Sequence, residues 1–215
     1  MRTRVKICGI TRVEDGMAAA REGADAIGLV FWPGTPRRVD YAKAREIVAE
    51  LPAFVTIVGL FVDPQPGDVR AALASVALDL LQFHGDESPE LCSSFERPYI
   101  KAVAVKPGVD LLHYASRYAG ARALLFDAFR PGDLPGGTGA TFDWSALPGR
   151  LPQPLVLSGG LTPRNVGAAI AQVKPWAVDV SSGVEVIGED GRPRKGVKDP
   201  VKIAAFIRGV RDADV

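Results

Sequence analysis

A cysteine ends a short apolar run near the N-terminus, in the segment "VKICGIT" (5–11). The run is typical of a buried strand, and Gly9, which has no Cβ, lets a ligand approach beside the thiol of Cys8. A free cysteine is commonly a small buried hydrophobe, but a thiol with a modestly lowered pKa is a usable base near neutral pH. Lys6 points to the same face as Cys8. It either lowers that pKa or pairs with Asp179 on a neighbouring strand, and we favour the pairing.

A carboxyl group ends a second apolar run, because Asp127 follows "ALLF". Desolvation at the end of an apolar strand raises the pKa of a carboxyl group, which then keeps its proton and can act as an acid. An aspartate that caps a turn is an equally good interpretation of the residue type alone. A thiol base and a carboxylic acid on nearly opposite strands could face one substrate from two sides.

Two turns of small residues, "SGG" (158–160) and "SSG" (181–183), follow later apolar runs. Backbone N–H groups in such turns, with helix-forming sequence after them, can bind an anion without a net positive charge. Glycines that only make tight turns are the alternative for either segment alone. The occurrence of both turns favours a phosphate site.

Other polar side chains lie after two further apolar runs. In "GTPRRVD" (34–40), Arg37 and Arg38 could clamp a carboxylate or a phosphate, although in isolation such a pair is more often solvated. Gln82 or His84 could face a pocket, but we expect His84 to be a structural histidine. The three tryptophans are interpreted as packing residues.

These candidates depend on the elements that carry them. Eight short runs rich in Val, Ile, Leu and Phe look like strands covered on both faces. They span residues 5–8, 26–31, 55–62, 78–83, 99–105, 123–127, 154–158 and 177–181. Helical patterns lie between and after them, at residues 12–23, 41–51, 66–76, 88–95, 109–120, 143–149, 162–173 and 199–213.

Eight strand–helix alternations in 215 residues predict an α/β fold, a single (β/α)8 TIM barrel spanning residues 1–215. A doubly wound sheet is the main alternative, but it usually has fewer strands. In the barrel the strand ends meet at one face, where active sites of this fold lie. Two longer irregular stretches, 128–142 and 187–198, are expected at that face.

Composition excludes several classes of function. Lysine and arginine total 26 against 25 acidic residues, for a net charge of +1, so no global field favours nucleic acid. Two cysteines and two histidines without metal-ligand spacing predict neither a disulfide framework nor a metal site. No apolar run is long enough to span a membrane, and the N-terminus lacks a signal-peptide core. We therefore expect a cytoplasmic protein.

Taken together, several segments closely resemble the phosphoribosylanthranilate isomerase family of tryptophan biosynthesis, whose members are (β/α)8 barrels. The resemblance runs in order from Lys6 to about Phe206. It rests on "KICGIT", "GLVFWPGTPRRV", "GLFV", "LQFHGDE", "LLFDAF…GGTGATFDW", "LSGGLTPRNV" and "AVDVSSGVE". The segment 186–199 looks longer than is usual in the family.

The resemblance implies a role for each candidate. Cys8 falls on the family's general base, Asp127 on its general acid, and Arg37 on the arginine that holds the substrate carboxylate, with Arg38 as the alternative register. The phosphate loops of the family fall on Gly159, Gly160, Ser182 and Gly183.

The implied reaction is the Amadori rearrangement of N-(5-phosphoribosyl)anthranilate, which needs no cofactor or metal. The expected partner is this small phosphosugar substrate, with no nucleic acid or membrane, and the protein is expected to be a monomer or homodimer. Asp127 must be protonated while Cys8 is deprotonated, so we expect the folded site to shift their pKa values in opposite directions. The alternatives are a dual-substrate isomerase that also acts in histidine synthesis and a non-catalytic phosphometabolite-binding protein.

Overall fold

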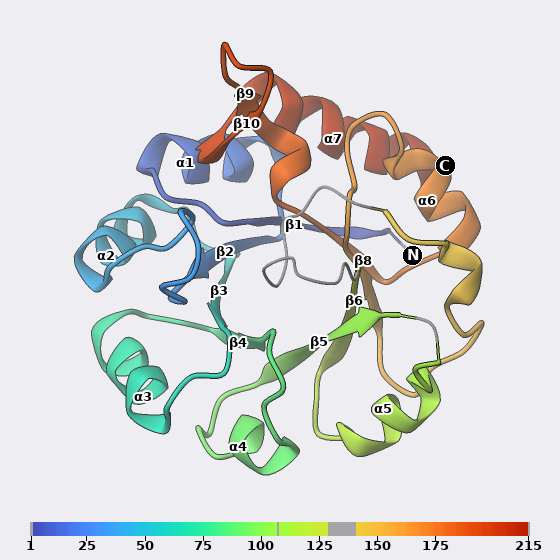
Figure 1. The fold of residues 1–215 in the computed structure, drawn as a ribbon. Coiled ribbons are helices and arrows are strands. Elements are labelled where there is room, and N and C mark those ends of the chain that lie inside the picture. Colours follow the sequence, from blue (N-terminus) through green and yellow to red (C-terminus); the bar gives the residue numbers. More distant parts are fainter. Residues whose placement is uncertain (1, 107, 129–140, 215) are drawn as a thin grey trace.

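A closed barrel of eight parallel strands forms the centre of the molecule, with the helices arranged around it (Figure 1). The computed structural model describes residues 2–106, 108–128 and 141–214. Each strand pairs with its sequence neighbours, and β1 closes the barrel against β8. The barrel strands are β1 (Arg4–Cys8), β2 (Ala26–Val30), β3 (Thr56–Phe61), β4 (Leu80–Phe83), β5 (Tyr99–Val105), β6 (Ala123–Ala128), β7 (Leu155–Leu157) and β8 (Ala177–Val180). The predicted TIM barrel is therefore confirmed.

The helices follow the predicted order and are mostly shorter at their ends than the sequence patterns. They are α1 (Val13–Glu22), α2 (Tyr41–Glu50), α3 (Pro66–Ser75), α4 (Pro89–Ser93), α5 (Leu111–Arg117), α6 (Val166–Val173) and α7 (Pro200–Ala213). Between β6 and β7 the described residues form only the 3-10 turn η1 (Trp144–Ala146). No helix in the described ranges is both long and apolar enough to cross a membrane.

Local sequence signals set several helix ends. The side chain of Asp199 accepts hydrogen bonds from two backbone N–H groups in the first turn of α7, and Pro200 follows it at the first helical position. Asp40 caps α2 in the same way through the N–H of Lys43. Gly23 ends α1 with a φ of 94°, a left-handed conformation that glycine adopts without strain.

One segment differs from the prediction. Residues 187–198 were expected to be irregular, but β9 (Glu185–Ile187) and β10 (Pro193–Lys198) form a two-stranded antiparallel sheet. We call residues 185–198 the hairpin; it lies beside α1 and α7 (Figure 1). The other stretch expected to be irregular, 128–142, falls mostly on residues 129–140, outside the described residues.

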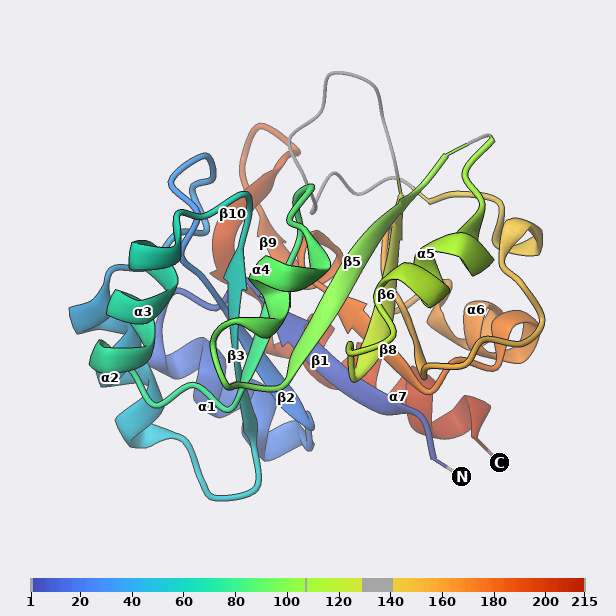
Figure 2. The same cartoon turned by 90° about the horizontal axis from the view of Figure 1, so that it is seen from below.

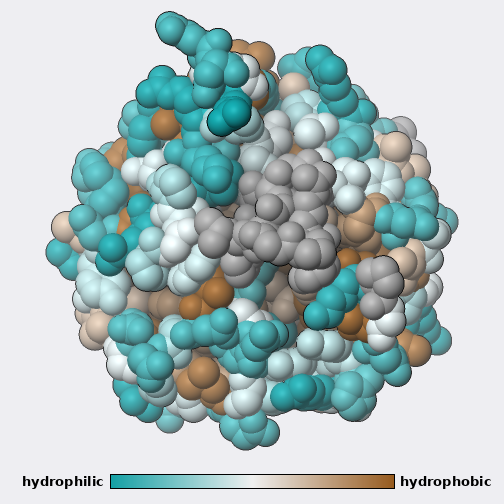
Figure 3. Space-filling view, in the orientation of Figure 1, coloured by the Kyte–Doolittle hydropathy of each residue, from teal (hydrophilic) through white to brown (hydrophobic). Residues whose placement is uncertain are grey.

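The two ends of the described chain and the hairpin lie at opposite ends of the barrel. At one end the first and last parts of the described chain lie side by side, and the backbone N–H of Thr3 donates to Asp214 over 2.7 Å. The hairpin lies at the opposite end (Figure 2). The face seen in Figure 1 is mostly hydrophilic around its rim, with small, separate hydrophobic patches (Figure 3).

Candidate active site

A pocket at the C-terminal ends of the barrel strands brings the predicted residues together. Cys8 from β1, Asp127 from β6 and Arg37 from the segment after β2 all line it. The turns after β7 and β8 contribute three more of the predicted residues, Gly159, Gly160 and Ser182. Gly183, the last of the predicted set, lines an adjoining depression together with Gly160 and Ser182.

Cys8 is almost completely buried at the end of β1. It pairs in register with Gly28 on β2, where an added Cβ would lie 2.7 Å from the Cys8 sulfur, so the missing side chain makes room for the thiol. Burial raises the pKa of the Cys8 thiol, and the positive charges of Lys6 and Lys198 oppose this only in part. The expected lowering of this pKa is therefore wrong.

Lys6 forms the predicted ion pair across the closure of the barrel. Its Nζ lies 2.8 Å from Oδ1 of Asp179, and both side chains are buried. Burial alone would lower the pKa of Lys6, but the charges of Asp179 and Cys8 outweigh it and raise that pKa. Lys6 therefore remains charged. Its ammonium group interacts with both the carboxylate of Asp179 and the thiol of Cys8.

Gly9 provides room for a protein side chain. It has a φ of 72°, and an added Cβ would lie 2.7 Å from Cδ of Arg37 and 3.1 Å from Oγ of Ser181. The space beside Cys8 that was expected to admit a ligand is therefore occupied by the side chain of Arg37.

Asp127 points toward the barrel axis. It continues the inward row of Ala123 and Leu125 on β6, which pack in the cluster of residues inside the barrel. Its Oδ1 accepts a hydrogen bond of 2.8 Å from the N–H of Ala128, and its Oδ2 lies 3.1 Å from Nε2 of His84. The carboxyl group is therefore buried and held on both oxygens.

His84 and Gln82 form a chain of hydrogen bonds that ends on Asp127. Nδ1 of His84 lies 2.9 Å from Nε2 of Gln82, and both residues line the pocket. With the Gln82 amide in this orientation, Nε2–H of His84 donates to the carboxylate of Asp127. His84 is satisfied, as expected of a structural histidine, but it belongs to the pocket as well. The sequence signal for this pocket position was that His84 lies two residues after Gln82, at the end of β4.

The pocket also has an apolar side that the sequence analysis did not identify. Val30, Leu60 and Trp32 pack with Cys8 and line the pocket. Trp32 was interpreted only as a packing residue. Its place directly after β2, at a strand end, was the signal for a pocket position.

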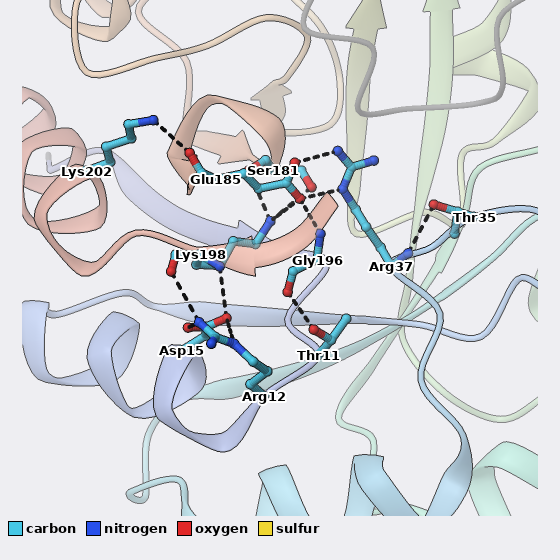
Figure 4. A network of polar contacts seen from close by, with 10 residues as sticks. All are labelled: Thr11, Arg12, Asp15, Thr35, Arg37, Ser181, Glu185, Gly196, Lys198 and Lys202. Carbon is cyan, nitrogen blue, oxygen red and sulfur yellow. Dashed lines mark hydrogen bonds and ion pairs between the residues drawn. The ribbon is translucent and has the colours of Figure 1, made fainter. Parts of the chain in front are cut away.

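Arg37 is buried, whereas Arg38 is exposed. Nε and Nη2 of Arg37 donate to the two carboxylate oxygens of Glu185 over 2.7 and 2.8 Å (Figure 4). Only Arg37 of the two lines the pocket. The sequence did not reveal Glu185 as a partner, because 148 residues separate the two.

Close packing with neighbouring backbone explains why glycine occurs in the turns after β7 and β8. Gly159 has a φ of 85°, and an added Cβ would lie 2.6 Å from the backbone nitrogen of Ala128. At Gly183 an added Cβ would lie 1.9 Å from the carbonyl oxygen of Leu161, so the turns after β7 and β8 touch there. Asn165 supports the first turn by donating from Nδ2 to the carbonyl of Gly160. The two turns thus form one continuous wall.

No group of three or more histidine, cysteine or acidic side chains among the described residues is placed to hold a metal ion. The arrangement provides a carboxyl group, a thiol, a guanidinium and a wall of small residues around one pocket. Such a site can bind a molecule with two anionic groups and move protons within it.

Comparison with known proteins agrees with this arrangement. Residues 5–209 match the family described as N-(5'phosphoribosyl)anthranilate (PRA) isomerase. The chain is 57% identical over 210 residues to the N-(5'-phosphoribosyl)anthranilate isomerase of Nitrosospira multiformis, covering 98% of this chain and 97% of that protein.

Solved structures of isomerases are similar over their whole length. A phosphoribosyl anthranilate isomerase from Thermotoga maritima superposes with a TM-score of 0.85 at 41% identity, covering 98% of this chain and 99% of that one. A phosphoribosyl anthranilate isomerase in complex with reduced 1-(o-carboxyphenylamino)-1-deoxyribulose 5-phosphate superposes with a TM-score of 0.81 at 37% identity and the same coverage. This chain therefore belongs to the N-(5'-phosphoribosyl)anthranilate isomerase family, the isomerases of tryptophan biosynthesis.

Proposed function

We propose that the chain catalyses the Amadori rearrangement of N-(5'-phosphoribosyl)anthranilate, an aldose-to-ketose isomerisation, with Cys8 as general base and Asp127 as general acid. The observation that carries this proposal is their joint position. Both line one pocket, from strands β1 and β6 on different sides of the barrel, and Arg37 and the glycine turns surround them.

The substrate has three parts that the pocket can bind separately. The turns that contain Gly159, Gly160, Ser182 and Gly183 offer backbone N–H groups and a hydroxyl to the phosphate. Arg37 pairs with the anthranilate carboxylate. The apolar side formed by Val30, Leu60 and Trp32 suits the aromatic ring. Holding both anions orients the reacting carbons between acid and base.

The acid step opens the sugar ring. Asp127 gives a proton to the ring oxygen while the anthranilate nitrogen supplies electrons, which leaves an iminium ion. Oδ1 is held by the N–H of Ala128 and Oδ2 by the ring of His84, so these contacts fix the orientation of the acid.

The base step forms the ketose. The thiolate of Cys8 removes the C2 proton, which the neighbouring iminium makes acidic, and the enolamine then tautomerises to the aminoketone. The substrate nitrogen is the electron sink, so these residues suffice for the step. Lys6 and Lys198 favour the thiolate against the effect of burial on its pKa.

The test is turnover of freshly prepared phosphoribosylanthranilate, followed by the loss of its fluorescence. Cys8→Ala and Asp127→Asn should each lower kcat/KM by about a hundredfold or more. Cys92→Ala, which removes the other buried free cysteine, is the matched control and should keep wild-type rates. Full activity in folded Cys8→Ala would eliminate Cys8 as the base. A folded wild type without turnover would overturn the isomerase and favour a binding role.

A further inference from the structure

The hairpin that follows β8 brings two completely buried charged residues to the pocket arginine. Glu185 at its start and Lys198 at its end are partners in the β9–β10 register, and both are fully inaccessible to solvent. Neither was a candidate in the sequence, where the segment 186–199 appeared only as an unexplained extension.

The contacts converge on one carboxylate. Oε1 of Glu185 accepts from Nε of Arg37 at 2.7 Å, from the N–H of Gly196 at 2.8 Å and from Nζ of Lys198 at 3.2 Å. Oε2 accepts from Nη2 of Arg37 at 2.8 Å. Figure 4 shows the guanidinium, the carboxylate and the ammonium side by side. The Nε–Nη2 edge of the arginine is thereby fixed in orientation.

The hairpin itself is attached firmly to the barrel. The N–H of Lys198 donates to Asp15 on α1 over 2.9 Å, and Nζ of Lys202 on α7 donates to the carbonyl of Glu185 over 2.7 Å. Thr11 donates to the carbonyl of Gly196 (Figure 4). An arginine from the segment after β2 is therefore held by a segment anchored to the first and last helices.

Glu185 is the carboxylate that these two cations share. Arg37 and Lys198 both contact it, and all three side chains are buried. Removing its charge would leave two buried cations without this partner.

We propose that Glu185 is a positioning residue that holds Arg37 in the orientation needed to bind the carboxylate of the substrate, with Lys198 as its charge partner. The inference rests on the proposed function. The hairpin acts on substrate affinity through the arginine and takes no part in proton transfer.

The experiment measures KM and kcat for Glu185→Gln, which keeps the shape and removes the charge. We expect KM to rise about tenfold and kcat to stay within about threefold, since the interaction lost is one of binding. In an Arg37→Met background the same substitution should change KM by less than about twofold, because coupled residues are not additive. The inhibition constant of inorganic phosphate should be unchanged in every variant.

Glu87→Gln is the matched control. It removes the carboxylate of another fully buried Glu–Lys pair, with Lys101 at 3.1 Å, and should leave KM unchanged. If Glu185→Gln does not fold, adding Lys198→Met removes one of the two buried cations left without Glu185, and the double variant should show the same rise in KM.

Three outcomes would overturn the inference while wild-type turnover supports the proposed function. An unchanged KM would show that Arg37 needs no support. A lower KM would show that Glu185 competes with the substrate for the guanidinium. An equal rise in KM with and without Arg37 would show that Glu185 acts elsewhere. Absence of turnover by the wild type would instead contradict the proposed function itself.

Discussion

Two buried clusters of the same chemical groups occupy different parts of the barrel. Each contains a free cysteine, a glutamate and a lysine, with the carboxylate and the ammonium 3.2 or 3.1 Å apart and almost wholly inaccessible. One, the pocket cluster, lies beside β1 and β8; the other, the sealed cluster, lies around β4, β5 and α4. Their members are Cys8, Glu185 and Lys198 in the pocket cluster and Cys92, Glu87 and Lys101 in the sealed cluster.

The charged groups of the two clusters have different interaction partners. In the sealed cluster one lysine faces one glutamate, and the remaining hydrogen bonds go to backbone: Lys101 donates to the carbonyls of Gly85 and Ala102, and Glu87 accepts from the N–H of Asp63. In the pocket cluster Arg37 adds a second cation. Burial of charged groups is common to both clusters and therefore does not identify a site. Contact with a side chain that lines the pocket, Arg37, distinguishes the pocket cluster.

The largest effect should come from breaking the sealed pair. Lys101→Met leaves the carboxylate of Glu87 buried without its counter-ion, and we expect the free energy of unfolding to fall by about 3–5 kcal/mol. Urea unfolding measures this, while kcat and KM of the folded fraction should match the wild type. A large change in KM would mean that the sealed cluster also serves the pocket and would remove the distinction.

The cysteines of the two clusters should differ in their rate of alkylation. Cys8 lines the pocket, whereas Cys92 is completely buried on α4. Iodoacetamide should modify Cys8 at least about tenfold faster, since reaction requires access as well as thiolate. Mass spectrometry of the two peptides gives both rates. Because burial raises the pKa of Cys8, its rate should still be rising above pH 9. Faster modification of Cys92 would contradict the assignment of the two clusters.

Alkaline stability should reveal the sealed thiol. Burial and then Glu87 raise the pKa of Cys92 from 9.0 to about 12. The unfolded state therefore loses this proton first as the pH rises, so the stability that the thiol contributes is complete below pH 9 and is lost between pH 9 and about 12. Removing it in Cys92→Ala should reduce the pH slope of the unfolding free energy by about 0.7 kcal/mol per unit at pH 9, approaching about 1.4 kcal/mol per unit above about pH 10.

The readout is urea unfolding at pH 8, 9 and 10, with comparison of slopes rather than of absolute values. Burial also raises the pKa of Tyr118, to about 12, and this contribution stays in the variant. An identical slope in wild type and Cys92→Ala would show that the thiol does not titrate in the folded protein in this way.

The smallest effect concerns the helix that carries Cys92. Ser88 caps α4 by accepting from the N–H of Leu91, and Ser88→Ala should lower the unfolding free energy by about 1 kcal/mol. Iodoacetamide should then reach Cys92 faster because α4 opens more often, with Cys8 modified at the wild-type rate. Accelerated modification of both cysteines would indicate global rather than local opening.

Much of this molecule follows from local sequence. The continuous apolar runs predicted all eight barrel strands, because strands covered on both faces need apolar residues throughout. Asp199 with Pro200, and Gly23, marked helix ends through capping that involves only neighbouring residues. The ends of the strands located Cys8 and Asp127, since parallel strands in a barrel finish at one face.

The hairpin was not predictable in the same way. β9 has only three residues, and β10 is polar and contains Gly196, so neither shows the alternation that signals a strand. Contacts with α1 and α7 stabilise them. The pKa of Cys8 was expected to be lowered, whereas burial raises it. The sequence shows that Lys6 lies two residues away, but it does not show how completely the thiol is buried.

The sequence by itself determined the barrel and the residue types that its strand ends present, because both depend on periodicity and on order along the chain. One long-range pair, Lys6 with Asp179, was already favoured from the sequence. Only the tertiary structure decided the others: Arg37 pairs with Glu185 and His84 with Asp127, which are 148 and 43 positions apart. Such contacts depend on closure of the barrel and on exclusion of water, and these are properties of the packed chain rather than of any segment.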